Sequence, residues 1–270
     1  MSRLTSYQGL TALITGASSG IGRGLALRFA KAGARVVLVA RRVDLLDTLA
    51  AEIQAQGGQA FVLPCDVADR EQVFAAARQA VDHFGAIDVL VNNAGYGHHR
   101  RFLDWDLDDQ ERMMRVNYFG TLYWTKALLP QMVERRRGWL VFVASVGGKL
   151  GVPEETAYAA SKFAMVGLAE ALSLEVEDAG VHTLTVCPGT IHTEFFDEEA
   201  LRRMPPVARR MMVEVEPLID AIMHALATGK HEITFPRFIG AGYIVRALAP
   251  GIMRRNTKRQ TLEALAKQQS

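Results

Sequence analysis

The sequence predicts a three-layer α/β fold in which helices cover both faces of a doubly wound parallel sheet. Short runs rich in β-branched residues alternate with longer segments whose apolar residues recur at helical spacing. The short runs are apolar throughout, which is typical of strands that are covered on both faces. No internal repeat or low-complexity linker interrupts this alternation, so we expect a single domain over residues 1–270.

Each element follows from its own pattern. The predicted strands are 12–15, 35–40, 60–67, 87–94, 138–145 and 181–188, and helical spacing recurs between them, for example over 21–32 and 68–84. After Thr193 the pattern loosens. There we expect a helical lid over about 193–216, a helix near 217–228 and a basic, apolar C-terminal extension over about 233–270. Strands and helices in this order are typical of a Rossmann-type sheet.

The bulk properties narrow the classes of function. The net charge of +2 is too small to indicate a nucleic-acid partner, and no nucleic-acid-binding motif accompanies it. Cys65 and Cys187 each end an apolar run, which favours two buried thiols over a disulfide and indicates a reducing compartment. No basic-then-apolar leader and no apolar run of ~18 residues occurs, so we expect a cytoplasmic protein.

A glycine-rich turn follows the first predicted strand and opens a helix in the stretch TGASSGIGRG. Glycines let backbone N–H groups approach a pyrophosphate, and the helix N-terminus supplies partial positive charge. A glycine cluster alone also marks ordinary tight turns, but the strand before it and the helix after it favour a dinucleotide site. The expected binding residues in this turn are Gly16, Ser18, Ser19, Gly20, Ile21 and Gly22.

The end of the second predicted strand indicates which dinucleotide is bound. An NAD-binding fold places an acidic residue there, about 20 residues after the glycine turn, whereas this chain has Ala40 followed by Arg41 and Arg42. No carboxylate repels a 2′-phosphate, and a guanidinium binds one with charge-assisted hydrogen bonds. We therefore predict a preference for NADP(H). The alternative is two solvated arginines that end a strand.

The chain resembles the short-chain dehydrogenase/reductase family from about residue 10 to about residue 195. The matching pieces are TGASSGIG, CDV at 65–67, NNAG at 92–95, Asn117 in RVNYFG, Ser145, the Tyr158 and Lys162 pair, and PGTIHT at 188–193. The resemblance implies a nicotinamide-dependent enzyme that forms a homodimer or homotetramer. It also implies further cofactor contacts: Asp66 and Val67 at the adenine, Asn93, Ala94 and Gly95 at a strand end, Pro188, Gly189, Ile191 and Thr193 near the nicotinamide, and Tyr158 and Lys162 themselves.

Tyr158 and Lys162 are four residues apart, a spacing that places both side chains on one face of a helix. A cation about 4 Å from a phenol is worth about 4 kcal/mol at an effective dielectric near 20. That energy would lower the phenol pKa by roughly three units from its usual value near 10. We therefore expect Tyr158 to titrate near neutral pH and to act as the proton donor.

The other catalytic roles follow from the chemistry of carbonyl reduction together with the resemblance. Ser145 would donate a hydrogen bond to the substrate oxygen, Lys162 would also bind the nicotinamide ribose, and Asn117 would hold a water that resupplies protons. None of the four positions departs from the family's catalytic tetrad. The predicted activity is reversible, NADPH-dependent reduction of a ketone or aldehyde.

The sequence is compatible with more than one class of substrate. Methionines 204, 211, 212 and 223 either pack the lid or line an adaptable pocket for an apolar, lipid-like or steroid-like substrate. The four arginines at 202, 203, 209 and 210 suit a carrier-bound 3-oxoacyl substrate instead, and a non-catalytic NADP(H)-sensing scaffold is the third alternative. The adjacent His98 and His99 have no partner at metal spacing, so we expect a substrate-side loop and no metal site.

The charge of the C-terminal extension is segregated. Residues 233–262 contain six bases and no acid, which leaves a charge of −4 on the remainder of a chain whose total is +2. Apolar residues are interleaved with these bases. The mixture suits a helix lying on an anionic bilayer, as a peripheral membrane contact. A pocket wall or a subunit contact is the alternative.

Overall fold

The computed structural model describes residues 3–196, 198–204 and 206–266. A parallel sheet of seven strands crosses its centre in the order β3-β2-β1-β4-β5-β6-β7. The strands are β1 (Thr11–Thr15), β2 (Arg35–Ala40), β3 (Gln59–Pro64), β4 (Val89–Asn92), β5 (Gly138–Val143), β6 (Val181–Pro188) and β7 (Glu232–Phe235). This is the predicted Rossmann-type fold in one domain, and the predicted fold class is confirmed.

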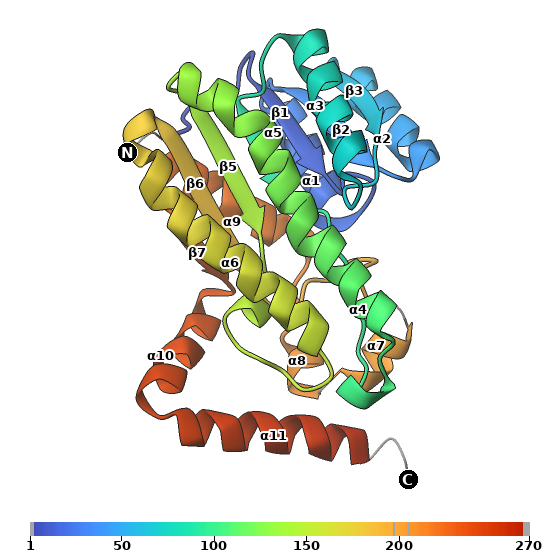
Figure 1. Cartoon of the computed structure of the whole chain (residues 1–270), viewed down its shortest axis with the longest axis vertical. Helices are drawn as coiled ribbons and strands as arrows, with labels where there is room; N and C mark the ends of the chain where they lie inside the picture. The colour runs from blue at the N-terminus through green and yellow to red at the C-terminus, as the bar shows by residue number, and fades with distance from the viewer. Residues whose placement is uncertain (1–2, 197, 205, 267–270) are drawn as a thin grey trace.

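Helices form a layer on each face of the sheet (Figure 1). One layer contains α1 (Gly20–Lys31), α2 (Val43–Ala55) and α9 (Val215–Thr228), and the other contains α3 (Arg70–Phe84), α5 (Gly120–Glu134) and α6 (Thr156–Val176). Each strand from β1 to β6 contributes apolar side chains to both layers, whereas β7 packs against the layer of α1, α2 and α9. All six residues of β5, for example, are buried, as expected for a strand that is covered twice.

The strand order creates the crevice in which a ligand would bind. From β1 the chain builds outward to β3 and then returns to the other side of β1, where β4 begins the second half. β1 therefore pairs with both β2 and β4, and the connections diverge at this point. In open α/β sheets, ligands bind outside the carboxyl ends of the strands at such a switch point.

Several predicted strands were too long at their carboxyl ends. β3 ends at Pro64, β4 at Asn92 and β5 at Val143, so the residues that follow lie in loops at the mouth of the crevice. The prediction also missed β7, a four-residue strand that pairs with β6. Residues 233–235, which were assigned to the C-terminal extension, therefore belong to the sheet. Cys65 and Cys187 are buried free thiols, as predicted.

Helical segments cover the carboxyl end of the sheet. After β6, Ile191 forms a parallel bridge with Val213, and the chain between them contains α7 (Glu198–Arg203) and α8 (Pro206–Arg210). α4 (Leu107–Met114) lies at the same end of the molecule (Figure 1). Beyond β7 come a short 3-10 turn (Arg237–Ile239), α10 (Gly240–Leu248) and α11 (Pro250–Ala266).

Parts of the predicted segments lie outside the described residues: 1–2 of the domain, 197 and 205 of the lid, and 267–270 of the extension. None of the helices in the described part of the chain combines the length and apolarity that crossing a bilayer requires.

Candidate active site

Four predicted catalytic residues come from three neighbouring parts of the fold. Ser145 directly precedes a 3-10 turn (Val146–Gly148) after β5, and Tyr158 and Lys162 lie in the first two turns of α6. Asn117 lies in a π-helical turn (Arg115–Phe119) between α4 and α5. π-turns inside helices frequently occur at functional sites, because they re-aim one side chain without ending the helix.

Ser145 and Tyr158 form one hydroxyl pair. The Ser145 Oγ accepts a hydrogen bond of 2.9 Å from the Gly147 backbone N–H, which fixes the position of its side chain. It also lies close enough to the Tyr158 hydroxyl to lower the pKa of that phenol through hydrogen bonding. Gly147 leaves room for this pair, since a Cβ there would lie 3.3 Å from both Ser145 Oγ and Tyr158 Cε1.

Lys162 is almost completely buried, with 3% of its surface exposed. Its Nζ donates a hydrogen bond of 2.9 Å to the Val143 carbonyl and lies 5.8 Å from the centre of the Tyr158 ring. Burial lowers the pKa of Lys162 to about 8, because an ammonium group loses its hydration there. The two side chains therefore share one face of α6, as the spacing predicts.

The predicted direction of the Tyr158 pKa is wrong. Burial raises the pKa of the phenol above its ordinary value of 10, while the hydrogen bond with Ser145 lowers it and the charge of Glu155 raises it. The expectation considered only a neighbouring cation and omitted the desolvation of the phenolate. The Lys162 ammonium also donates its hydrogen bond to a backbone carbonyl, that of Val143.

Asn117 is fully buried, and its side chain forms hydrogen bonds with two segments of the site. Its Oδ1 accepts a hydrogen bond from the Tyr96 N–H at 3.0 Å, and its Nδ2 donates to the Tyr96 carbonyl at 2.9 Å and to Ser161 Oγ at 3.0 Å. The Ser161 hydroxyl in turn donates to the Tyr158 carbonyl. Asn117 thus fixes the loop after β4 against the first turn of α6.

The glycine turn has the shape that a pyrophosphate requires. Gly16 and Gly20 have φ of +66° and +52°, in the left-handed region that favours glycine. A Cβ at Gly22 would lie 2.2 Å from the Gly16 carbonyl oxygen, so only glycine lets the turn pack against α1. No side chain caps the N-terminus of α1 at Ser19. Side-chain capping therefore does not occupy its first N–H groups, which suit an anionic ligand.

Arg42 lies over this turn. Its guanidinium donates hydrogen bonds to Ser18 Oγ at 3.0 Å and to Ser19 Oγ at 2.8 Å. It also forms an exposed ion pair with Glu194 at 3.3 Å, a kind of contact that is worth little in water. Arg41 is exposed beside it, and the preceding Ala40 is buried. A guanidinium therefore occupies the end of β2, where NAD-binding sites have a carboxylate.

The remaining predicted cofactor residues line the crevice mouth at the strand ends. Asn93 Nδ2 donates to the Thr15 carbonyl at 2.9 Å, and Thr15 Oγ1 accepts from the N–H groups of Asn93 and Ala94, so the loop after β4 is tied to the glycine turn. A Cβ at Gly95 would lie 3.1 Å from Asn117 Oδ1 and 3.5 Å from Lys162 Nζ.

On the opposite sides of the mouth, Asp66 binds Arg112 at 3.2 Å, and Val67 packs against Gly120. The Gly189 N–H, after Pro188, donates to the Phe235 carbonyl at 2.7 Å. Ile191 is buried, and the Thr193 side chain packs against Gly20. Ile21 is partly buried in the first turn of α1.

Aromatic side chains pack beside Tyr158. The Phe195 ring lies 5.7 Å from the Tyr158 ring and 5.0 Å from the Phe196 ring, measured between centres. A Cβ at Gly97 would lie 3.0 Å from both Phe195 Cζ and Tyr158 Cδ2. An apolar cover of this kind over Tyr158 suits an apolar ligand.

A buried charged cluster flanks this cover, and the sequence analysis missed it. The Glu154 side chain is 5% exposed, and its carboxylate lies 3.4 Å from Arg203 Nε of α7 and 3.8 Å from Arg101 Nε. The next residue, Glu155, accepts a hydrogen bond of 2.9 Å from His99 Nε2. The two acids shortly before Tyr158 were the available signal, but nothing in the local sequence indicated their partners.

The charged cluster joins three segments. The Glu154 carbonyl accepts a hydrogen bond of 2.9 Å from the Arg100 N–H, and the His99 ring packs against Phe196 at 6.3 Å. Neighbouring Glu155 and Glu154 raise the pKa of His99 above its ordinary value, against the opposing effects of burial and Arg203. The loop after β4, the start of α6 and α7 are therefore held together beside Tyr158.

Comparisons with known proteins identify the family to which this chain belongs. The family model described as short chain dehydrogenase matches residues 10–203. The chain is 35% identical over 254 residues to Dehydrogenase/reductase SDR family member 7B of Mus musculus, covering 89% of this chain and 77% of that one. It is 38% identical over 220 residues to Oxidoreductase UcpA of Salmonella typhimurium, covering 81% and 82% of the two chains.

A solved structure leads to the same family. The crystal structure of a short-chain type dehydrogenase/reductase from Mycobacterium marinum superposes with a TM-score of 0.78 at 31% identity, over 85% of this chain and 94% of that one. The family match covers the whole crevice, from the glycine turn to α7. The chain belongs to the short-chain dehydrogenase/reductase family, whose members are oxidoreductases that use nicotinamide cofactors.

Proposed function

We propose that this chain is an NADPH-dependent reductase of ketones or aldehydes and that it oxidises the corresponding alcohols when the cofactor ratio is reversed. The observation that carries the proposal is the hydroxyl pair of Ser145 and Tyr158, with Lys162 buried behind it at the mouth of the dinucleotide crevice. Carbonyl reduction needs a hydrogen-bond donor and a proton donor at one oxygen. The two hydroxyls fit those needs.

The nicotinamide cofactor, when bound, supplies the hydride. Tyr158 keeps its proton at neutral pH, since burial raises its pKa, and is ready to donate it to a substrate oxygen. Ser145 donates the second hydrogen bond to that oxygen and helps to orient it. Lys162 stabilises the negative charge that develops on the phenol, and Asn117 lies beside it around Gly95, a placement that supports its role in resupplying protons.

We propose NADP(H) as the cofactor. Support comes from Arg42, whose guanidinium lies on Ser18 and Ser19 of the turn that fits the pyrophosphate, and from the absence of a carboxylate at Ala40. A 2′-phosphate next to Arg41 and Arg42 would gain charge-assisted hydrogen bonds. The exposed Glu194 pairs with Arg42, but an ion pair of this kind is worth little in water.

The aromatic cover of Phe195 and Phe196 supports an apolar substrate, including a lipid-like or steroid-like one. A carrier-bound 3-oxoacyl substrate has less support. Of the arginines that suggested it, Arg203 pairs with buried Glu154, and Arg209 donates a hydrogen bond to the Leu201 carbonyl. Both arginines thus already bind groups within the protein, which weakens the argument that they bind an anionic carrier.

A homodimer or homotetramer in the cytoplasm completes the proposal. Two free, buried thiols support a reducing compartment.

The experiment that tests the activity follows NADPH oxidation with a panel of ketones, in the wild type and in Tyr158→Phe. Turnover by the wild type that is lost in the variant supports the reductase. No turnover with any carbonyl compound, combined with normal NADPH binding, would favour the cofactor-sensing scaffold. Faster turnover of phosphopantetheine-linked ketones than of free ones would favour the carrier-bound substrate.

A further inference from the structure

The C-terminal arm, residues 237–259, exposes an unusual amount of apolar surface. Five of the thirteen exposed large apolar side chains among the described residues belong to it. Their exposed fractions are 62% for Phe238, 62% for Ile244, 40% for Val245, 82% for Leu248 and 58% for Ile252. Large apolar side chains that are exposed together on one segment and interleaved with charge indicate an interaction site.

The same arm is uniformly basic. Its bases are all exposed, and they are Arg237, Arg246, Arg254, Arg255, Lys258 and Arg259. The sequence has no acid between residues 233 and 262. Among the side chains that the structure describes, none of these bases forms an ion pair with a carboxylate. The charge of the arm is therefore not neutralised by the body of the protein.

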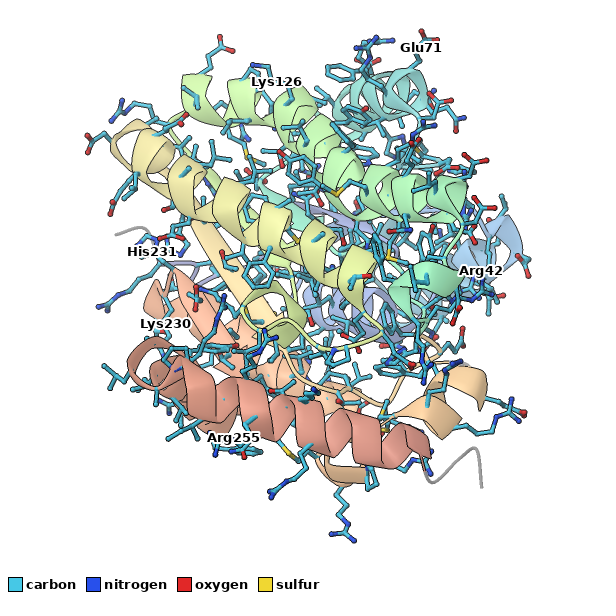
Figure 2. All side chains as sticks on the ribbon, turned by 60° about the horizontal axis from the view of Figure 1, so that its bottom comes forward. Arg42, Glu71, Lys126, Lys230, His231 and Arg255 are labelled. Atoms are coloured by element: carbon cyan, nitrogen blue, oxygen red, sulfur yellow. The ribbon has the colours of Figure 1, made fainter. Side chains whose placement is uncertain are left out.

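The arm projects from the body and lies at one end of it. α11 packs chiefly on α10 and crosses beneath α7 and α8, at the end toward which the strands point (Figure 1). Figure 2 shows α11 along the lower edge of the molecule, with Arg255 on its outer side. α10 is anchored to the body, because Arg246 donates a hydrogen bond to the Lys149 carbonyl and lies over the Phe163 ring.

We propose that the arm is a docking surface for an anionic lipid bilayer. A bilayer surface offers acyl chains for the apolar side chains and phosphate or carboxylate groups for the bases, and a basic amphipathic helix lies at that boundary. A second copy of this chain fits less well. Two arms that face each other bring like charges together with no acid on either arm to separate them.

Docking would turn the active site toward the membrane. Lys149 and Leu150, which contact α10, follow Ser145 in the same loop, and Phe163 follows Lys162 on α6. An apolar substrate dissolved in the bilayer would then reach Tyr158 without crossing bulk water. This second step rests on the proposed function, whereas the docking itself does not.

The test is co-sedimentation of the purified full-length protein with phosphatidylcholine vesicles, with and without about 30% phosphatidylserine. The charge variant is Arg254→Glu/Arg255→Glu, and its matched control is Arg70→Glu/Arg78→Glu, which makes the same change in net charge on exposed positions of α3. The apolar variant is Leu248→Asp/Ile252→Asp. Its control is Leu174→Asp, at a 77% exposed position near the C-terminal end of α6.

We expect the wild type to bind anionic vesicles on the order of tenfold more tightly than neutral ones, and salt at about 0.5 M to release it. Both arm variants should lose binding on the order of tenfold, while both controls keep it. Equal binding by the wild type and the charge variant, or no preference for anionic lipid, would overturn the proposal. So would a dimer that the apolar variant converts to monomer, without any vesicle binding.

The proposed reductase activity is tested separately, by measuring NADPH oxidation with a water-soluble ketone in the absence of vesicles. Both arm variants should match the wild type in that assay. A protein that binds vesicles but turns over no ketone would retain the docking surface and lose the reductase.

Discussion

The Lys162 Nζ lies 5.8 Å from the centre of the Tyr158 ring, and the two side chains emerge from the same face of α6 one turn apart. Ser145 acts on the Tyr158 hydroxyl as well, since hydrogen bonding with it lowers the pKa of the phenol. This arrangement is suited to moving one proton.

Tyr158→Phe removes that proton and leaves the ring in place. We expect kcat for ketone reduction to fall by about 10²- to 10⁴-fold, the usual contribution of a positioned acid, while NADPH affinity and the melting temperature hardly change. Steady-state NADPH oxidation measures the first and fluorescence titration the second. Tyr123→Phe, on α5, is the control. Equal rates in the wild type and Tyr158→Phe would remove the proton-donor role.

Lys162 should give the enzyme an alkaline limit. Its pKa is lowered to about 8, so the ammonium form prevails below that pH and is lost above it. Because kcat/KM for NADPH reports the free enzyme, we expect it to fall as pH rises through about 8. Lys162→Arg remains protonated, so its lower activity should show no such inflection between about pH 7 and about pH 9. The same inflection in both proteins would assign it to another group.

Arg42 should select the cofactor. Arg42→Ala removes a guanidinium that lies on Ser18 and Ser19, and we expect the KM for NADPH to rise by about tenfold to a hundredfold while that for NADH barely changes. Arg41→Asp should shift the preference toward NADH by adding a charge that repels the 2′-phosphate. The exposed Arg115, paired with Glu111, supplies the control Arg115→Ala. An unchanged ratio of the two KM values in both variants would contradict NADP(H) preference.

Glu154 should position the cover over Tyr158. Its buried carboxylate faces Arg203 of α7 and Arg101, and we expect Glu154→Gln to lower the free energy of unfolding by about 1–3 kcal/mol, because charge-assisted contacts are lost in a buried place. If the carboxylate also holds α7 in place, KM for the ketone should rise more than kcat falls, and KM for NADPH should stay constant.

A second substitution at Glu154 separates its charge from its backbone. The residue has a φ of +68°, which costs roughly 1–2 kcal/mol for any residue with a Cβ. Glu154→Gly removes the same carboxylate and relieves that strain, so we expect it to be more stable than Glu154→Gln yet equally impaired in KM for the ketone. If the KM for the ketone is closer to the wild-type value in the more stable of the two variants, the charged cluster acts on folding alone.

The parts of the fold that could be predicted are those encoded locally. The apolar run RVVLVA predicts β2, because a strand that is covered on both faces needs apolar residues throughout. The turn after β1 is predicted by its glycines, because only glycine allows the close approach to α1. β7 escaped prediction because four residues followed by a proline carry almost no pattern.

The site was predictable only where its residues recur in a local motif. Tyr158 and Lys162 could be paired from their spacing, but the direction of the Tyr158 pKa depends on desolvation, which only the packed structure reveals. Glu154 and Arg203 are 49 residues apart, and their contact depends on where α7 lies. Such contacts arise from tertiary packing, so local sequence patterns do not predict them.

His99 should make stability depend on pH. Its pKa is raised by the hydrogen bond and charge of Glu155 and by the charge of Glu154, while burial and Arg203 act in the opposite direction. A raised histidine pKa stabilises the folded state fully below the unfolded value of 6.5, and this stabilisation is lost as pH rises through the folded pKa. We therefore expect His99→Gln to cost more stability at about pH 5.5 than at about pH 8.5, measured by urea unfolding.

His182 provides a control of opposite sign. Burial lowers its pKa, and the neighbouring His231 acts in the same direction, so the folded state resists protonation and loses stability as pH falls below 6.5. His182→Gln should therefore destabilise the protein less at about pH 5.5 than at about pH 8.5, the reverse of His99→Gln.

Glu155→Gln should remove most of the pH dependence that His99 confers, because it removes the main cause of the raised pKa. A His99 contribution that is constant with pH would mean that its ion pair with Glu155 is not formed in solution.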